Sequence, residues 1–75
     1  MRSRPEPAPA DGLRAHSAAL RSHADRLRRA AGDLRWRGPR ADAFRAEVAV
    51  LADRCTTAAG GLDLAAAQLA DPDRP

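Results

Sequence analysis

Residues 34–39 read Leu-Arg-Trp-Arg-Gly-Pro and separate two segments that each have helical periodicity. Gly38 supplies the permissive backbone with which helices commonly end. Pro39 suits the first position of a new helix, because it has no donor N–H and its φ is fixed. Trp36, the one tryptophan of the chain, lies between the two segments. The stretch therefore predicts an antiparallel helical hairpin with a Trp-x-Gly turn at residues 36–38.

The segment before the turn repeats leucine every seven residues. The repeat consists of Leu13, Leu20, Leu27 and Leu34, with the small residues Ala24, Ala30 and Ala31 beside it. A helix brings such positions to one face, and Asp11 can cap its N-terminus, so we predict a helix over about 12–35. The opposite face is expected to hold Arg14, Arg21, Arg28 and Arg35. Helix-stabilising charge pairs are expected at i,i+4 spacing: Arg21/Asp25, Asp25/Arg29, Arg29/Asp33 and Asp33/Arg37.

The segment after the turn has a heptad seam, in which apolar or small residues alternate at steps of three and four. Its members are Ala41, Phe44, Val48, Leu51, Cys55, Ala58, Leu62, Ala65 and Leu69. A further column broadens this face: Ala43, Val50, Thr57 and Leu64. We predict a helix over about 39–70 with a weak point or kink at Gly60 and Gly61.

The composition leaves a single hairpin with little apolar area to bury. Of the hydrophobic residues 19 are Ala and only eight are Leu, and the chain has 75 residues. With the turn centred near Arg37, residues 63–70 should also project past the first helix. We therefore predict an all-α fold in which two hairpins pair into a four-helix bundle dimer. The predicted interface residues are Leu13, Leu20, Leu27, Leu34, Phe44, Val48, Leu51, Leu62 and Leu69.

Trp36 and Gly38, followed by Ala41 and Phe44, lie between two amphipathic helices in a small chain. In this combination the chain resembles the WXG family of small type VII secretion proteins, the Esx-like helical hairpins, over about residues 12–70. The resemblance implies a dimer with a second copy, with another WXG-type hairpin or with the N-terminal domain of a larger effector. It also implies export in the folded state by a secretion ATPase, and it makes Trp36 and Gly38 the family motif.

The chain departs from the family in being shorter and in having no Tyr. The Tyr-x-x-x-Asp/Glu export signal that follows the second helix of many members is therefore missing. Since members without the signal can travel with a partner, the resemblance implies a secreted substrate, a co-secreted partner or a chaperone of a larger effector. The sequence has no Sec-type leader and no apolar stretch long enough to span a bilayer. We expect a cytoplasmic protein that is secreted without a Sec signal peptide.

Both ends of the chain are rich in proline and poor in residues that a core could bury. Residues 1–11 contain Pro5, Pro7 and Pro9, and residues 71–75 contain two further prolines. We expect both segments to be disordered tails.

A different function, nucleic-acid binding by a small basic helical protein, is suggested by a pI near 10.9. Seven arginines lie between Arg14 and Arg37. However, Asp25 and Asp33 interleave with them, and the chain has no aromatic platform for bases. Nucleic acid is therefore the less favoured partner.

The sequence predicts no enzyme, no catalytic residue and no cofactor, because Ser17, Ser22 and the histidines have no spacing that assembles a nucleophile and a base. His16 and His23 lie about 10 Å apart along one helix, too far to hold one metal ion, but they could make a dimer sensitive to acid. Cys55 is expected to pack in the seam, with a disulfide to a second copy as the alternative. Trp36 is expected to cap the core or to contact the secretion machinery.

Overall fold

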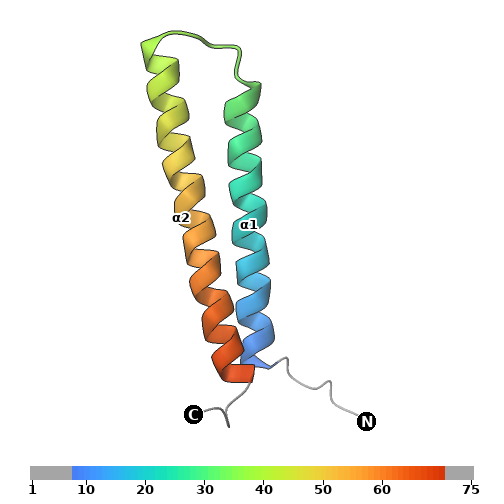
Figure 1. The fold of residues 1–75 in the computed structure, drawn as a ribbon. Helices are drawn as coiled ribbons and strands as arrows, with labels where there is room; N and C mark the ends of the chain where they lie inside the picture. Colours follow the sequence, from blue (N-terminus) through green and yellow to red (C-terminus); the bar gives the residue numbers. More distant parts are fainter. Residues whose placement is uncertain (1–7, 71–75) are drawn as a thin grey trace, which may run out of the picture.

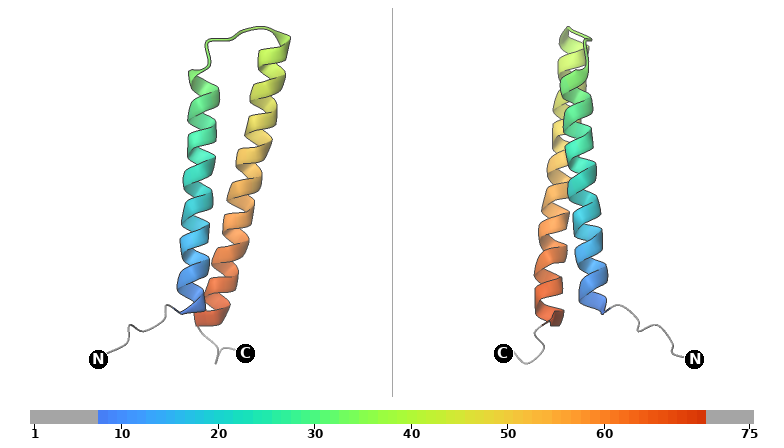
Figure 2. Two further views of the ribbon diagram at one scale, coloured as in Figure 1. Left: turned by 180° about the vertical axis from the view of Figure 1, so that it is seen from behind. Right: turned by 90° about the vertical axis from the view of Figure 1, so that its right-hand side faces the viewer.

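The computed structural model describes residues 8–70, which form two long helices joined by a short connection (Figure 1). Helix α1 spans Pro9–Asp33 and helix α2 spans Pro39–Ala70. The helices run antiparallel and lie side by side in a single layer, as the two further views in Figure 2 show. The described residues contain no strand. The predicted all-α hairpin is therefore confirmed.

Helix α1 begins earlier than predicted, at Pro9 instead of about residue 12. Proline is well tolerated in the first turn, where a backbone N–H would have no partner within the helix. The N–H of Asp11 donates to the carbonyl oxygen of Ala8 over 2.9 Å. Asp11 is therefore inside the first turn, near the positive end of the helix dipole, and its predicted role as the N-cap is wrong. The rest of the tail predicted for residues 1–11, and all of residues 71–75, lie outside the described residues.

Helix α1 also ends earlier than predicted, at Asp33 instead of near residue 35. Leu34 is extended, and its N–H donates to the carbonyl oxygen of Ala31 over 3.4 Å. The connection therefore covers residues 34–38 and is longer than the predicted turn at 36–38. Gly38 has a φ of +115°, a conformation that residues with a side chain rarely adopt. Its carbonyl oxygen accepts the N–H of Asp42 over 3.0 Å, which starts α2 immediately after the glycine.

The line along which the helices touch is made of small side chains. In α1 the buried residues are Ala10, Ser17 and Ala24, and in α2 they are Ala41, Val48, Ala52, Ala59 and Ala66. We call these eight residues the seam. A side chain that ends at Cβ lets the two backbones approach closely, so leucine is displaced from this line. Of the seam predicted for α2, only Ala41 and Val48 lie on this line. At positions 51, 58 and 65 the buried alanine comes one residue later in the chain, and positions 44, 55, 62 and 69 are not buried.

At the end away from the connection the two helices stay packed as far as the first turn of α1, so the predicted overhang of residues 63–70 is wrong. Ser17 of α1 donates a hydrogen bond to Ala59 of α2, and Ala66 is completely buried one heptad further along α2. Because α1 starts at Pro9, its first turns lie beside the end of α2 (Figure 1). Helix α2 continues through Gly60 and Gly61 without interruption.

Candidate interaction face

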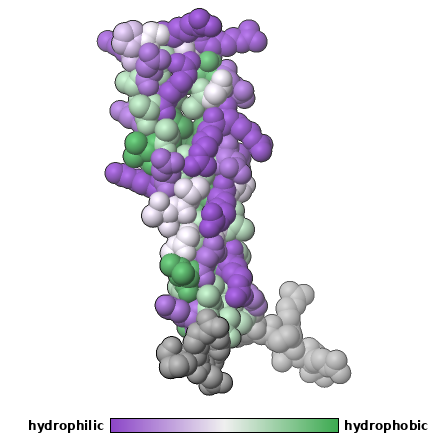
Figure 3. All heavy atoms as spheres, in the orientation of Figure 1, coloured by the Kyte–Doolittle hydropathy of each residue, from purple (hydrophilic) through white to green (hydrophobic). Residues whose placement is uncertain are grey.

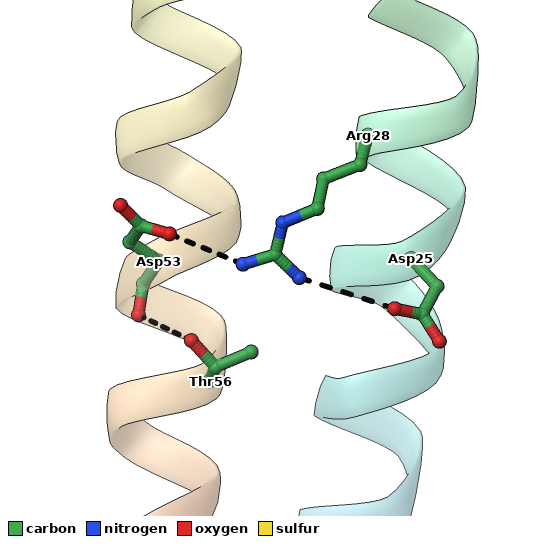
Figure 4. A network of polar contacts seen from close by, with 4 residues as sticks. All are labelled: Asp25, Arg28, Asp53 and Thr56. Carbon is green, nitrogen blue, oxygen red and sulfur yellow. Dashed lines mark hydrogen bonds and ion pairs between the residues drawn. The ribbon is translucent and has the colours of Figure 1, made fainter. Parts of the chain in front are cut away.

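One face of the hairpin is polar, and it is the face seen in Figure 3. Hydrophilic side chains run along most of its length there, between and beside the two helices. Arg21 of α1 reaches across to Asp63 of α2 over 2.7 Å, and Arg28 reaches Asp53 over 3.1 Å. Figure 4 shows the Arg28 guanidinium between Asp53 and Asp25, whose carboxylate is 3.9 Å away. We call the side of the hairpin that carries these ion pairs the polar face.

The ion pairs correct two predictions about the charges of α1. The arginines 14, 21 and 28 were expected opposite the seam, but Arg21 and Arg28 flank it and bind carboxylates of α2. The four predicted i,i+4 pairs are not among the ion pairs of the described residues; Arg14 and Arg28 instead pair at i,i+3 with Asp11 and Asp25. An arginine beside the seam can reach the facing helix. A residue on the outer side of α1 is too far from α2 to form such an ion pair.

Asp63 is the carboxyl group whose pKa is changed most by the contacts on the polar face. Hydrogen bonds from the side chains of Ser17 and Arg21 lower its pKa below the usual 3.8, and the charges of Arg21 and Arg14 act in the same direction. The single hydroxyl proton of Ser17 has two acceptors in reach, this carboxylate and the Ala59 carbonyl oxygen at 3.1 Å. Asp63 therefore stays ionised on the polar face.

The large apolar side chains lie on the other face, and a simple spacing rule places them there. Residues at i+3 and i+4 flank residue i of a helix on opposite sides. Arg21 and Asp63, which pair on the polar face, each follow a seam residue by four positions: Ser17 and Ala59. Residues that follow the seam by three positions must therefore share the opposite face. In α1 these are Leu13, Leu20 and Leu27; in α2 they are Phe44, Leu51, Cys55, Leu62 and Leu69.

We call these eight residues the apolar face. It includes every predicted interface residue except Val48, which is 8% exposed and belongs to the seam, and Leu34, which is extended in the connection. The hairpin itself covers the face poorly, since Phe44, Leu51 and Leu69 are 43%, 50% and 53% exposed. The three leucines contributed by α1 are half-buried, as are Leu62 and Cys55. The hairpin thus has an uncovered apolar stripe along its length.

The side of α2 that points away from α1 carries a second, weaker set of apolar residues. Val50 and Leu64 are both exposed there, and Ala43 and Thr57 complete the predicted column. Three of these four side chains are smaller than leucine, so the column offers less apolar area than the apolar face.

Arg45 ties the connection to α2, a role that our sequence analysis did not predict. Its guanidinium donates to the carbonyl oxygen of Leu34 over 3.1 Å and also to that of Trp36. It pairs with Asp42 over 3.3 Å as well. Carbonyl oxygens at and just after a helix C-terminus lack partners within the helix. An arginine in the first turns of α2, close in sequence to these oxygens, is the feature of the sequence that could have predicted this contact.

Trp36 is held through its backbone, while its side chain is 51% exposed. Its indole N–H makes no hydrogen bond within residues 8–70. His16 and His23 are both exposed on α1. Residues 8–70 contain no group of three or more side chains placed to hold a metal ion. In the same range neither helix has an apolar stretch long enough to cross a bilayer.

Comparison of the chain with protein-family models, with curated proteins and with solved structures finds no match. The surface features that bear on function are the apolar face, the polar face and the connection around Trp36.

Proposed function

We propose that this protein is a binding module that pairs with a second helical hairpin through its apolar face, which produces a four-helix bundle. One observation carries the proposal. The seam buries alanine, one serine and one valine, and no large side chain of the described residues is fully buried. The leucines and Phe44 instead lie at the surface, where covering each half-exposed side chain would contribute about 1 kcal/mol.

We further propose that the pairing serves type VII secretion, as in the WXG family that the chain resembles. Support comes from Trp36 and Gly38 in the connection, with Ala41 in the seam and Phe44 on the apolar face. The positive φ of Gly38 gives a physical reason for glycine at the third position of the motif. In this proposal the protein is made in the cytoplasm, binds its partner there and is exported without a Sec signal peptide.

The role that we favour within this system is that of a co-secreted partner or chaperone. The 75 residues contain no Tyr, so no Tyr-x-x-x-Asp/Glu signal of the kind found in many family members lies within them. In this proposal the partner hairpin supplies the signal, as a sister protein or as the N-terminal domain of an effector. Binding to nucleic acid is not favoured, because aspartates interrupt the basic surface of α1 and pair with three of its five arginines, Arg14, Arg21 and Arg28.

The chain offers a matched pair of variants for testing the pairing surface. Leu51 on the apolar face and Val50 on the outer side of α2 are neighbours with the same exposure, 50% and 51%. We expect Leu51→Glu to weaken association at least about tenfold, because pairing would bury an unpaired charge. Val50→Glu should leave association unchanged.

Sedimentation equilibrium of the two variants and the unchanged protein measures this difference. The measurement should be made on the protein alone and on the protein co-expressed with a Trp-x-Gly hairpin encoded by an adjacent gene, where there is one. Equal weakening by both variants would show that the apolar face is not the pairing surface.

A further inference from the structure

The surplus positive charge of the chain is concentrated at the end of the hairpin that carries the connection. Residues 34–45, which we call the tip, contain four of the 13 arginines but only one of the ten acidic residues. The tip thus has a formal charge of +3, which equals the charge of the whole chain. The remaining residues contain nine basic and nine acidic groups and are neutral. The net charge of the chain is therefore accounted for by the tip.

Three arginines of the tip are free to bind an external group. Arg45 is occupied by the connection, and it also neutralises Asp42, the single acid of the tip. Arg35, Arg37 and Arg40 are exposed and form no ion pair or hydrogen bond with the described part of the chain.

Trp36 lies between two of these arginines in the sequence, and half of its side chain is exposed. The backbone that presents it is held at both ends, by the Arg45 guanidinium and by the turn at Gly38. The tip forms the end of the hairpin opposite the start of α1 and the end of α2 (Figure 1). It therefore offers one aromatic ring and three cations on a fixed, projecting segment.

We propose that the tip binds the surface of a membrane that contains anionic phospholipids. Tryptophan favours the headgroup region, and guanidinium groups form strong hydrogen bonds with phosphate. A fluid lipid surface can adapt to a projecting tip. A protein partner would need about 20–30 residues on each side for a stable interface, more than the tip contains. Nucleic acid would need a longer track of free cations, and the arginines along α1 that flank the seam are paired.

The proposal does not depend on the pairing of two hairpins. Arg35, Trp36 and Arg37 lie in the connection, and Arg40 lies in the first turn of α2, so none of them belongs to the set of residues proposed to pair. Because neither helix in residues 8–70 can span a bilayer, the contact would be peripheral and sensitive to salt.

Trp36 provides the readout, because the chain has one tryptophan and no tyrosine. The full chain is titrated with vesicles of phosphatidylcholine, alone or mixed with phosphatidylglycerol. We expect a saturable blue shift of the emission with the mixed vesicles only, which weakens as salt is added. Arg37→Gln and Arg40→Gln should each lower the partition coefficient about fivefold. Arg54→Gln, an equal charge change on the exposed surface of α2, should leave it nearly unchanged.

Three results would overturn the proposal. One is the absence of a blue shift with the mixed vesicles at low salt. Another is a decrease in the partition coefficient with Arg54→Gln as large as that with Arg40→Gln, which would indicate attraction by the overall charge instead of a site at the tip. The third is tighter binding of an oligonucleotide than of the vesicles, which would assign the tip to nucleic acid. Far-UV circular dichroism of each variant confirms that the helices are intact.

Discussion

Ser17 is the one polar side chain that the described residues bury, with 2% of its surface exposed. It replaces alanine in an otherwise small and apolar line of α1, and it donates to the Ala59 carbonyl oxygen of α2. A slip of one helix along the other would leave this hydroxyl buried without its partner. Ser17, together with the pair of Arg21 and Asp63 beside it, thus favours one register of the two helices.

Asp63 should make the stability of the hairpin depend on pH. Its pKa in the folded chain lies below 3.8, first because of the hydrogen bond from Ser17 and then because of Arg21. The unfolded chain therefore takes up the proton first as pH falls. The contribution of Asp63 to stability is present above pH 3.8 and is lost as pH falls through the lower, folded value.

The test compares Asp63→Asn with the unchanged protein in urea unfolding at neutral pH and well below pH 3.8. We expect the variant to be less stable at neutral pH and the difference to vanish in acid. Salt should reduce the difference, because the Asp63 side chain is half exposed. Asp33→Asn, at an exposed position without an ion pair among the described residues, is the control. A difference between Asp63→Asn and the unchanged protein that persists in acid would contradict this account of Asp63.

At the scale of the helices, the sequence predicts α2 better than α1. Gly38 and Pro39 mark the start of α2, and its observed bounds of 39–70 are those predicted. The predicted start of α1 is wrong because Asp11 suits an N-cap and the prolines before it favour a tail, whereas Pro9 in fact occupies the first turn of the helix.

The contact line between the helices was less predictable, for a physical reason. The leucine repeat is the strongest periodic signal in α1, but the buried residues lie three positions before each leucine. A single hairpin can bring alanine to the centre and leave leucine at the edge, since close backbone approach needs small side chains. The predicted interface residues are nonetheless nearly all on one face, because the same heptad spacing governs both sets.

Enlarging a seam residue should separate the helices. Ala24 has no exposed surface, so Ala24→Leu should lower the free energy of unfolding by about 1–3 kcal/mol. Ala19→Leu, the same change at an exposed position of α1, should have little effect. Thermal unfolding followed by circular dichroism measures both variants. Equal stability of the two would mean that leucine can occupy the seam.

The connection between the helices should depend on Arg45. Arg45→Gln removes charged hydrogen bonds to the carbonyl oxygens of Leu34 and Trp36, and we expect a loss of about 1.5–3 kcal/mol in the free energy of unfolding. Faster amide hydrogen exchange at the end of α1 should accompany the loss. Arg54→Gln serves as the matched control, and an equal effect of the two changes would show that the Arg45 contacts contribute nothing specific.

At the scale of the whole molecule, the hairpin separates its surfaces by chemistry. Ion pairs line one face, large apolar side chains line the other, and the surplus charge lies at the tip. The leucine repeat alone does not predict this separation, because the separation depends on small residues, and not the leucines, forming the seam. It leads to two proposals that use different residues: pairing through the apolar face, and lipid binding through Trp36 and the three unpaired arginines of the tip.

The central claim is that one hairpin leaves too much apolar surface exposed to be stable without a partner. The most direct test is analytical ultracentrifugation combined with thermal unfolding over a wide range of protein concentration. We predict a species of at least twice the chain mass of 8.0 kDa, with a melting temperature that rises with concentration. A compact 8.0 kDa monomer that melts cooperatively at the same temperature at every dilution would contradict the claim.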